Sequence, residues 1–251
     1  MDLGISGKRA LIVGGSSGLG LAAANALASE GVAIAIFSRD VARLEKACHV
    51  VGQLGVEAKG HSGDIASNDD ILALADWLKW TGGLDILVLN TPRPPSPMRA
   101  FLAEDDDERW EQGYRDQLQS ALRLLRAVTP LMLNKGWGRI IGVTSASVKQ
   151  PMARHALSSV FRAGVQAALK HLVEEVAPHG ITVNAVAPAT ILTPTFSSFH
   201  DLERRISEIP LRRAGTLEEF GGTVAFLASQ SAGFITGQTI QLDGGMTRSL
   251  V

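Results

Sequence analysis

RALIVGGSSGLG, residues Arg9 to Gly20, joins a strand-like run to a helical stretch through a glycine turn. Residues 10–13 are continuously apolar, as in a buried strand, and the alanine-rich residues 19–29 that follow the turn have helical character. A strand, a glycine turn and a helix present backbone N–H groups and a positive helix end to a phosphate. The sequence therefore predicts a pyrophosphate-binding turn, with a structural turn as the alternative. Three glycines are predicted to let the pyrophosphate approach the backbone: Gly14, Gly18 and Gly20.

Strand-like and helix-length segments alternate along the rest of the chain. Strands are predicted at residues 33–37, 57–61, 85–89, 139–144, 181–186 and 239–242. Helices are predicted at residues 41–54, 69–81, 152–177 and 217–229, and residues 108–135 form one or two more. Apolar strands separated by helices imply a parallel sheet covered on both faces. Because no repeat, low-complexity tract or linker divides the chain, residues 1–251 are predicted to form one α/β domain.

The two least regular segments, residues 91–99 and 189–209, follow predicted strands. Loops at the carboxyl ends of parallel strands are where ligands bind. Residues 189–209, which include Phe196, Phe199 and His200, are therefore predicted to form a mobile lid over the substrate.

Composition excludes several classes of protein. The 24 basic and 25 acidic residues give no reason to expect binding to nucleic acid or to an acidic membrane surface. One cysteine, Cys48, excludes an internal disulfide, and no ligand set around His49 has the spacing of a metal site. The start, MDLGISGKR, lacks the apolar segment of a signal peptide, and no apolar run is long enough to cross a bilayer. We expect a cytoplasmic protein without a metal.

Residues at the predicted strand ends indicate which dinucleotide binds. Ser38 and Arg39 stand where an acidic residue would hold the ribose hydroxyls of NAD. A guanidinium suits the 2′-phosphate of NADP, so the sequence favours NADP, and a solvated surface charge is the alternative for Arg39. Asp64 is predicted to accept a bond from the adenine amino group or to cap the next helix. Asn90 has an amide that can bond either the backbone or the cofactor.

The chain resembles the short-chain dehydrogenase/reductase family, most closely the 3-oxoacyl-acyl-carrier-protein reductase type, over residues 5–248. The resemblance rests on the glycine spacing, on Asp64 and Asn90, and on the motifs VNAVAP, ITGQ and DGG, which begin at Val183, Ile235 and Asp243. It implies one doubly wound Rossmann-type domain with a seven-stranded parallel sheet, a small carbonyl or alcohol substrate, and a homotetramer or homodimer. It also implies NADP contacts at Gly14, Ser16, Ser17, Gly18, Leu19, Gly20, Ser38, Arg39, Asp64, Ile65, Asn90, Arg162 and Pro188.

The catalytic positions implied by the resemblance depart from the family pattern. The family uses a Tyr as acid and base, a Lys four residues later, a Ser thirteen residues earlier and an Asn on a preceding helix. Ser145 matches the family Ser, whereas Ser158 stands for Tyr, Arg162 for Lys and Gln117 for Asn. The change at position 158 is the severe one, because an alkyl hydroxyl is a far weaker acid than a phenol.

Several groups are candidates to replace the missing phenol. His155 lies three residues before Ser158 and titrates in the useful range, although it could equally be a surface or capping histidine. Water held by Ser145, Ser158 and Gln117 is a second candidate, and Tyr114 a third. Lys149 is a cation that binds an anionic substrate group or faces solvent.

Three functions fit these residues. The favoured one is an NADP-dependent oxidoreductase with an altered proton path, which the retained Ser145 and the cationic Arg162 support. The second is a weakly active or inactive NADP-binding protein that acts as a sensor or partner subunit, which the loss of Tyr supports. The third is a non-redox lyase-type reaction. The helices at residues 111–135 and 152–177 are apolar on more than one side, which predicts subunit contacts or deep packing on the sheet.

Overall fold

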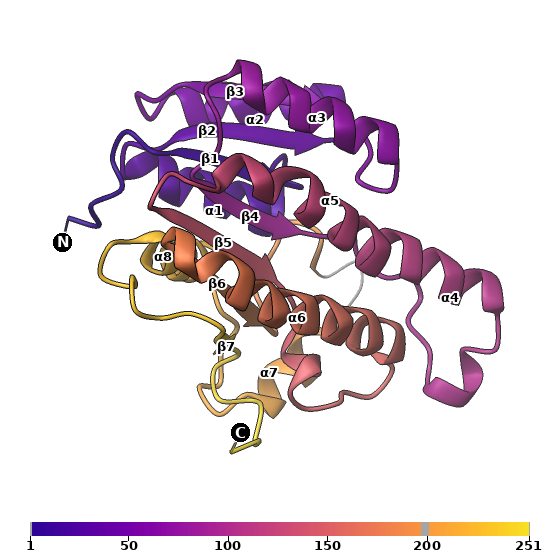
Figure 1. Ribbon diagram of the computed structural model, residues 1–251. Coiled ribbons are helices and arrows are strands. Elements are labelled where there is room, and N and C mark those ends of the chain that lie inside the picture. The colour runs from indigo at the N-terminus through magenta and orange to yellow at the C-terminus, as the bar shows by residue number, and fades with distance from the viewer. Residues whose placement is uncertain (1, 197–200, 251) are drawn as a thin grey trace.

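A seven-stranded parallel sheet, in the order β3-β2-β1-β4-β5-β6-β7, forms the centre of the molecule and confirms the predicted doubly wound fold (Figure 1). The computed structural model describes residues 2–196 and 201–250. The strands are β1 Arg9–Val13, β2 Ala33–Ser38, β3 Ala58–Ser62, β4 Ile86–Asn90, β5 Gly138–Val143, β6 Ile181–Pro188 and β7 Thr239–Leu242. The chain leaves β1 toward β2 and later returns to pair β4 with β1, so the order reverses there. Such a reversal opens a crevice at the carboxyl ends of the strands.

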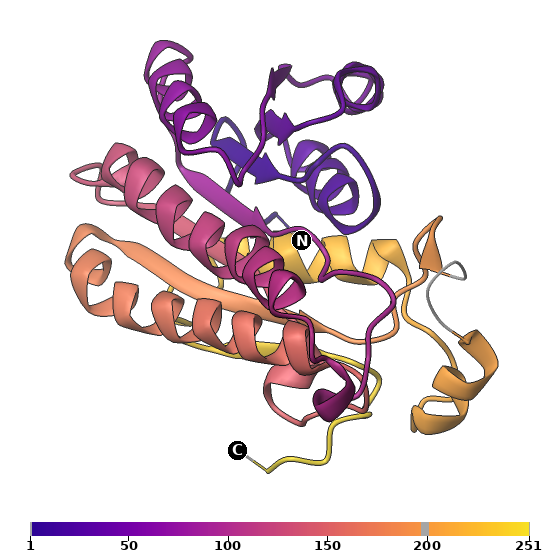
Figure 2. The same ribbon diagram turned by 90° about the vertical axis from the view of Figure 1, so that its right-hand side faces the viewer.

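Helices cover both faces of this sheet. The helices α1 Gly18–Ser29, α2 Val41–Gly52 and α8 Leu217–Ala228 pack on one face, and α3 Asn68–Trp80, α5 Ser120–Val128 and α6 Ala156–Val176 pack on the other (Figures 1 and 2). Side chains along β1 alternate between the two cores. Ala10 and Ile12 face the first core, and Leu11 and Val13 face the second. Because both faces are buried, the strand reads as a continuous apolar run.

The segment predicted as one or two long helices between residues 108 and 135 is divided further. It forms α4 Asp107–Gly113, a π-helical segment Tyr114–Gln119, α5 and the 3-10 turn Thr129–Met132. Pro130 stands at the start of that last turn, where its missing N–H costs least. The π-helical register was not predicted, because apolar periodicity does not distinguish i+5 from i+4 hydrogen bonding.

The structure also differs from the prediction before α6 and within residues 189–209. The helix expected from residue 152 begins at Ala156, after Arg154 with a positive φ of 61°. Residues 189–209, predicted to be irregular, contain α7 Leu202–Glu208, which Asp201 caps by accepting from the backbone N–H of Arg204. Phe199 and His200 of the predicted lid lie outside the described residues. The short 3-10 turns Phe101–Ala103, Ala146–Val148 and Ala177–His179 complete the chain.

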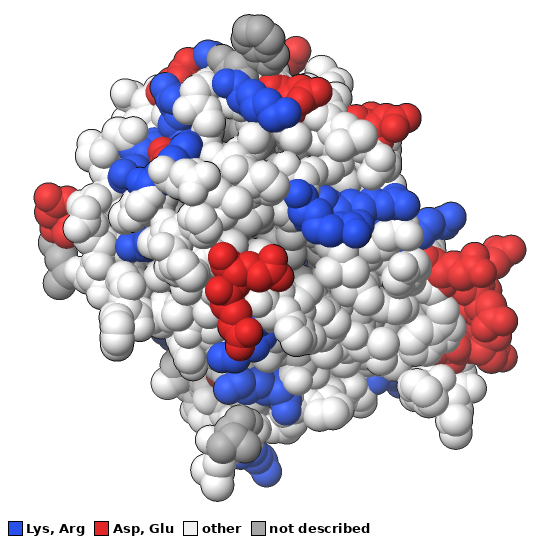
Figure 3. All heavy atoms as spheres, viewed as in Figure 1, with Lys and Arg blue, Asp and Glu red and all other residues white. Residues whose placement is uncertain are grey.

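Charges of both signs share the face shown in Figure 3, in keeping with the nearly balanced composition. Acidic side chains gather at the end where Figure 1 labels α4, whose first turn carries Asp107 and Glu108. Within residues 2–196 and 201–250, no helix combines the length and the apolar character needed to span a membrane.

Candidate functional site

The glycine turn after β1 leaves room for an anion at the start of α1. Gly14 and Gly18 have positive φ values of 67° and 52°, which side chains rarely adopt. A Cβ at Gly14 would lie 3.1 Å from Nδ2 of Asn90, whereas one at Gly18 would meet nothing nearer than Cγ2 of Thr193 at 3.7 Å. The Ser17 side chain does not cap α1, and no acidic residue stands in its first turn. The helix end therefore fits a pyrophosphate.

Gly20 has a different role from the one predicted. A Cβ at Gly20 would collide with the carbonyl oxygen of Gly14 and lie 2.9 Å from Cα of Gly15. Gly20 is buried, and because it has no side chain, α1 can pack closely against the turn at Gly14 and Gly15. The prediction that its missing side chain makes room for the pyrophosphate is wrong, because protein backbone already fills that space.

The predicted adenosine end lies where β1 and β2 finish together, since Val13 pairs with Phe37. The hydroxyls of Ser16 and Ser38 are 2.8 Å apart, and Nη1 of Arg39 lies 3.5 Å from Oδ2 of Asp64. The Arg39 side chain is 66% exposed, so it remains accessible to a ligand phosphate.

The acidic residue nearest to this strand end is already engaged. Asp40 caps α2 by accepting from the backbone N–H of Arg43 and also pairs with the Arg43 guanidinium, at 3.0 and 3.1 Å. No ribose-binding acid stands at the strand tip itself, which is Ser38. This arrangement fits a 2′-phosphate better than a free ribose hydroxyl.

Asp64 and Ile65 lie at the side of the crevice. Oδ1 of Asp64 accepts from the backbone N–H of Ala66 at 2.9 Å, so the carboxylate stabilises the turn before α3. The cap of α3 is Ser67, which accepts from the backbone N–H of Asp70, so the prediction of Asp64 as a helix cap is wrong. Ile65 is buried in the core beneath.

A cavity of about 1010 Å³ opens at the carboxyl ends of β4, β5 and β6. The segment after β4, the start of α6, α7 and the C-terminal residues 246–248 line it. We call this cavity the cleft. It brings together six of the predicted catalytic and cofactor-binding residues, Leu19, Ser145, His155, Ser158, Arg162 and Pro188, with Phe196 of the predicted lid. Gln117 and the residues of the adenosine end are not part of its lining.

Two serines face the cleft from β5 and α6. The Ser145 hydroxyl accepts from the backbone N–H of Ser147 at 3.2 Å and lies 3.0 Å from the Ser147 hydroxyl. These contacts fix the position of Ser145 just after β5. Ser158 is buried in the first turn of α6. The two hydroxyls thus reach the cleft from rigid elements, which suits the positioning of a substrate oxygen.

Arg162 lies one turn further along α6 and is 8% exposed. Its Nη1 donates to the carbonyl oxygens of Val143 and Thr144, at 2.9 and 3.0 Å, and Nη2 donates to that of Pro92 at 3.5 Å. Burial and, to a smaller extent, the neighbouring Arg93 charge lower the pKa of Arg162 to about 10. The side chain stays cationic at neutral pH, without an acidic partner among the described residues.

His155 precedes α6 with both ring nitrogens engaged. Nδ1 lies 2.8 Å from the carbonyl oxygen of Ala153, which can only accept, so Nδ1 carries the proton. Nε2 then accepts from Nη2 of Arg205 at 3.0 Å. Burial lowers the pKa of His155, and the Arg205 charge acts in the same direction. The geometry contradicts His155 as proton donor, because its one proton points to the backbone.

The remaining candidates lie outside the cleft lining. Tyr114 is 41% exposed and its ring packs near Phe161, and Lys149 is exposed at the end of a 3-10 turn. Gln117 is fully buried in the π-helical segment, where neither amide atom has a hydrogen-bond partner within the part of the chain that the structure describes.

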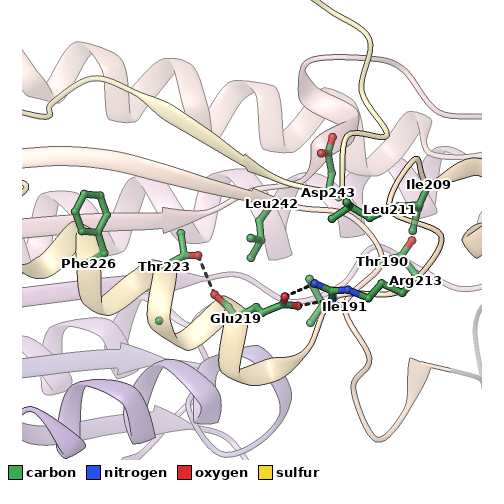
Figure 4. Close-up of a pocket in the computed structure, with 13 residues that line it drawn as sticks. Thr190, Ile191, Ile209, Leu211, Arg213, Glu219, Thr223, Phe226, Leu242 and Asp243 are labelled. Atoms are coloured by element: carbon green, nitrogen blue, oxygen red, sulfur yellow. Dashed lines mark hydrogen bonds and ion pairs between the residues drawn. The ribbon is translucent and has the colours of Figure 1, made fainter. Parts of the chain in front are cut away.

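A second cavity, of about 490 Å³, lies between α8, β7 and residues 209–215 (Figure 4). Arg213 and Glu219 form a two-pronged ion pair in it, with N–O distances of 2.9 and 2.6 Å. Because these charges neutralise each other and no predicted site residue lines this cavity, the cleft is the better candidate for chemistry.

Comparison with known proteins places the chain among reductases. A family profile described as enoyl-(acyl carrier protein) reductase matches residues 13–247. Nodulation protein G of Azospirillum brasilense is 33% identical, over 96% of this chain and 99% of that protein. The 3-oxoacyl-[acyl-carrier-protein] reductase FabG of Pseudomonas aeruginosa is 31% identical, over 98% and 100%. The crystal structure of L-sorbose reductase from Gluconobacter frateurii with NADPH and L-sorbose has a TM-score of 0.92 and 32% identity, with complete coverage of both chains.

Proposed function

The chain belongs to the short-chain dehydrogenase/reductase family, and we propose that it is an NADP(H)-dependent reductase of a carbonyl substrate with an altered proton supply. One observation carries the proposal: the cleft holds the Ser145 hydroxyl and the buried Arg162 cation beside Leu19, at the start of the helix that the glycine turn introduces. A hydroxyl and a cation that face the same cleft can stabilise negative charge on a substrate oxygen. The reverse reaction would oxidise the corresponding alcohol.

The chain's residues fit NADP(H). The uncapped end of α1, with the open position at Gly18, would hold the pyrophosphate. Ser16, Ser38 and Arg39 would hold the 2′-phosphate. The L-sorbose reductase of the same family was solved with NADPH, which supports this choice. Asp64, Asn90, Arg162 and Pro188 are proposed to contact the rest of the cofactor from the edge of the crevice.

Ser145 and Arg162 are proposed to act on the substrate oxygen. The bound cofactor supplies the hydride. When the Ser147 hydroxyl donates to Ser145, the Ser145 hydrogen is left to donate to the substrate oxygen. Arg162 is held in place by three backbone carbonyls and opposes the negative charge that develops on that oxygen.

The proton is proposed to come from water that Ser145 and Ser158 hold in the cleft. An alkyl hydroxyl at position 158 cannot replace a phenol as a general acid at neutral pH. General acid catalysis typically contributes ~10²–10⁴-fold, so we expect turnover to be slower than in a Tyr-containing relative by a factor of this order.

A second function is favoured by a specific observation. Arg162 is tied to the ends of β4 and β5 by backbone carbonyls, so its charge could serve architecture alone. Together with Ser158 in place of Tyr, this supports an NADP(H)-binding protein with little turnover that acts as a sensor or partner subunit.

Restoring the phenol tests the choice between these functions. NADPH oxidation is followed at 340 nm with a panel of ketones and 3-oxoacyl thioesters, for the wild type, Ser158→Tyr and Ser158→Ala, and NADPH binding is measured by calorimetry. Because Ser158 faces the cleft, a ring at this position has room to enter it. We expect slow oxidation by the wild type, an increase on the order of 10²-fold in kcat for Ser158→Tyr, and a further decrease for Ser158→Ala, which removes a hydroxyl that holds the proposed water.

The outcomes separate the candidates. NADPH binding without oxidation across the panel, in the wild type and in Ser158→Tyr, would favour the binding protein. No binding of NADPH at all would overturn both functions.

A further inference from the structure

The cleft carries an excess of positive charge. Its described lining contains six arginines and two acidic residues: Arg93, Arg154, Arg162, Arg204, Arg205 and Arg248, with Asp201 and Glu208. Both acids are engaged, since Glu208 pairs with Arg204 at 3.5 Å and Asp201 caps α7. Like charges that share a partly enclosed cavity repel one another, so the arrangement favours a bound anion.

Arg205 is the half-buried cation of the cleft lining, whereas Arg162 is buried and the other four arginines are exposed. Arg205 projects from α7, and its guanidinium contacts the Met152 sulfur at 3.7 Å and Nε2 of His155 at 3.0 Å. Neither partner is acidic, and no ion pair of Arg205 occurs within residues 2–196 and 201–250; the carboxylate that acts on it electrostatically is that of Glu208, which pairs with Arg204. A guanidinium has five N–H donors, so these two contacts leave donors for an oxyanion.

His155 holds this guanidinium close to the catalytic serines. Because Nδ1 donates to the Ala153 carbonyl, Nε2 is fixed as the acceptor for Arg205. His155 is the residue before α6, and Ser158 lies three residues later in its first turn. Residues with this spacing lie ~5–6 Å apart between Cβ atoms. An anion on Arg205 would thus share the cleft with a carbonyl held by Ser145 and Ser158.

We propose that Arg205, positioned by His155, binds an oxyanion of the substrate, so that the enzyme selects a short carbonyl compound with a carboxylate or phosphate group. This inference rests on the proposed reductase function and names its substrate class. Arg205 acts as a specificity-determining residue, and His155 as a positioning residue rather than an acid.

Arg93 is assigned to the cofactor side of the same cleft. Its Nη2 lies 3.4 Å from Oγ1 of Thr193, and Thr193 is the residue nearest to the open position at Gly18. A cation there faces the pyrophosphate end of the crevice. The substrate anion is therefore placed on Arg205, which reaches the cleft from α7.

Matched pairs of anionic and neutral carbonyl compounds test the proposal. Acetoacetate, 3-oxohexanoate and dihydroxyacetone phosphate are each compared with methyl acetoacetate, methyl 3-oxohexanoate and dihydroxyacetone. Binding to the NADP⁺-saturated protein is measured by calorimetry, because this complex binds the ketone without hydride transfer. Oxidation of NADPH by the same compounds gives KM and kcat separately.

The variants are Arg205→Gln, Arg205→Lys and His155→Ala, with Arg204→Gln as the control because that neighbouring charge is paired with Glu208. We expect at least one anionic compound to bind about 10-fold or more tightly than its neutral counterpart, the gap expected of a charge-assisted hydrogen bond. Arg205→Gln should remove this preference and raise KM for the anion at little cost to kcat. Arg205→Lys should retain part of the preference for the anion, and Arg204→Gln should retain all of it. His155→Ala should weaken the preference severalfold by raising KM for the anionic compound.

Two results would overturn the inference: no preference for any anionic member of the panel, or an Arg205→Gln variant that loses anionic and neutral compounds equally. If anions bind through Arg205 but NADPH is never oxidised, the reductase function fails and the anion site stands. If neutral ketones are reduced as well as the anions, the function stands and the anion site fails.

Discussion

At the residue scale, the proposed preference for NADP(H) rests on Arg39. The Arg39 guanidinium is exposed and contacts Asp64 at 3.5 Å, and such a surface ion pair contributes little stability. The Arg39 charge is therefore available to a 2′-phosphate, and little stability is lost if its ion pair with Asp64 is weakened. The serine hydroxyls beneath it are 2.8 Å apart and supply neutral donors at the same end of the crevice.

Arg39→Ala should weaken NADPH binding much more than NADH binding. A hydrogen bond to a charged group contributes ~1.5–3 kcal/mol, so we expect NADPH Kd to rise by about 10–100-fold while NADH Kd changes little. Fluorescence titration of the reduced cofactors measures both. Arg43→Ala is the control, because Arg43 pairs with Asp40 instead. Equal losses for the two cofactors would disprove the assignment of the 2′-phosphate.

At the element scale, the π-helical segment between α4 and α5 is the least ordinary local structure. Its wider turn places Gln117 in the interior, where the amide is fully buried and unpartnered among the described residues. π-bulges are uncommon and are found often at functional sites, and a buried unsatisfied amide is costly. This cost is understandable if Gln117 holds water for the proposed proton path.

Gln117→Leu should stabilise the fold and slow turnover. Replacement of a buried unsatisfied amide by an apolar side chain of similar size removes a penalty of about 1–3 kcal/mol, so we expect a Tm higher by a few degrees. Thermal unfolding and kcat are measured together, with Gln112→Leu on the exposed side of α4 as the control. A lower Tm would show that the amide is satisfied in the folded protein.

At the scale of the whole molecule, α6 has an exposed face of small apolar residues. Val160 is 49% exposed, and Ala163 and Ala167 on the following turns are exposed too. The opposite side of the helix packs on the sheet through Val165 and Leu169. Deep packing on the monomer's own sheet therefore does not explain this face, which supports the predicted subunit contact.

Val160→Glu should shift the assembly toward monomer. We expect the wild type to sediment as a homodimer or homotetramer, and the variant, with a charge placed on the proposed contact, to dissociate at micromolar concentration. Analytical ultracentrifugation measures both, and Lys46→Glu, exposed on α2 on the other side of the sheet, is the control for charge alone. A monomeric wild type would show that this face has another purpose.

The predictable part of the site is the part that is local in sequence. The turn from β1 to α1 was recognisable because glycine spacing and an apolar run lie within twelve residues, Arg9 to Gly20. The role of Gly20 could not be recognised from the sequence, because it depends on a close contact with the backbone of Gly14. The His155–Arg205 pair joins residues fifty positions apart, and Arg205 lies on α7, which periodicity did not reveal. No local signal could have shown that Nε2 of His155 is occupied.

The amino-acid sequence by itself determined the doubly wound fold, the glycine turn between β1 and α1 and the presence of Ser158 at the position of the family Tyr, since burial patterns, backbone freedom and residue identity are local properties of the chain. Only the tertiary structure decided which charges meet in the cleft, which nitrogen of His155 carries the proton, and that Gln117 is sealed inside a π-turn. Electrostatic contacts fall off with distance in space rather than along the chain, so they become visible only once distant segments are packed together.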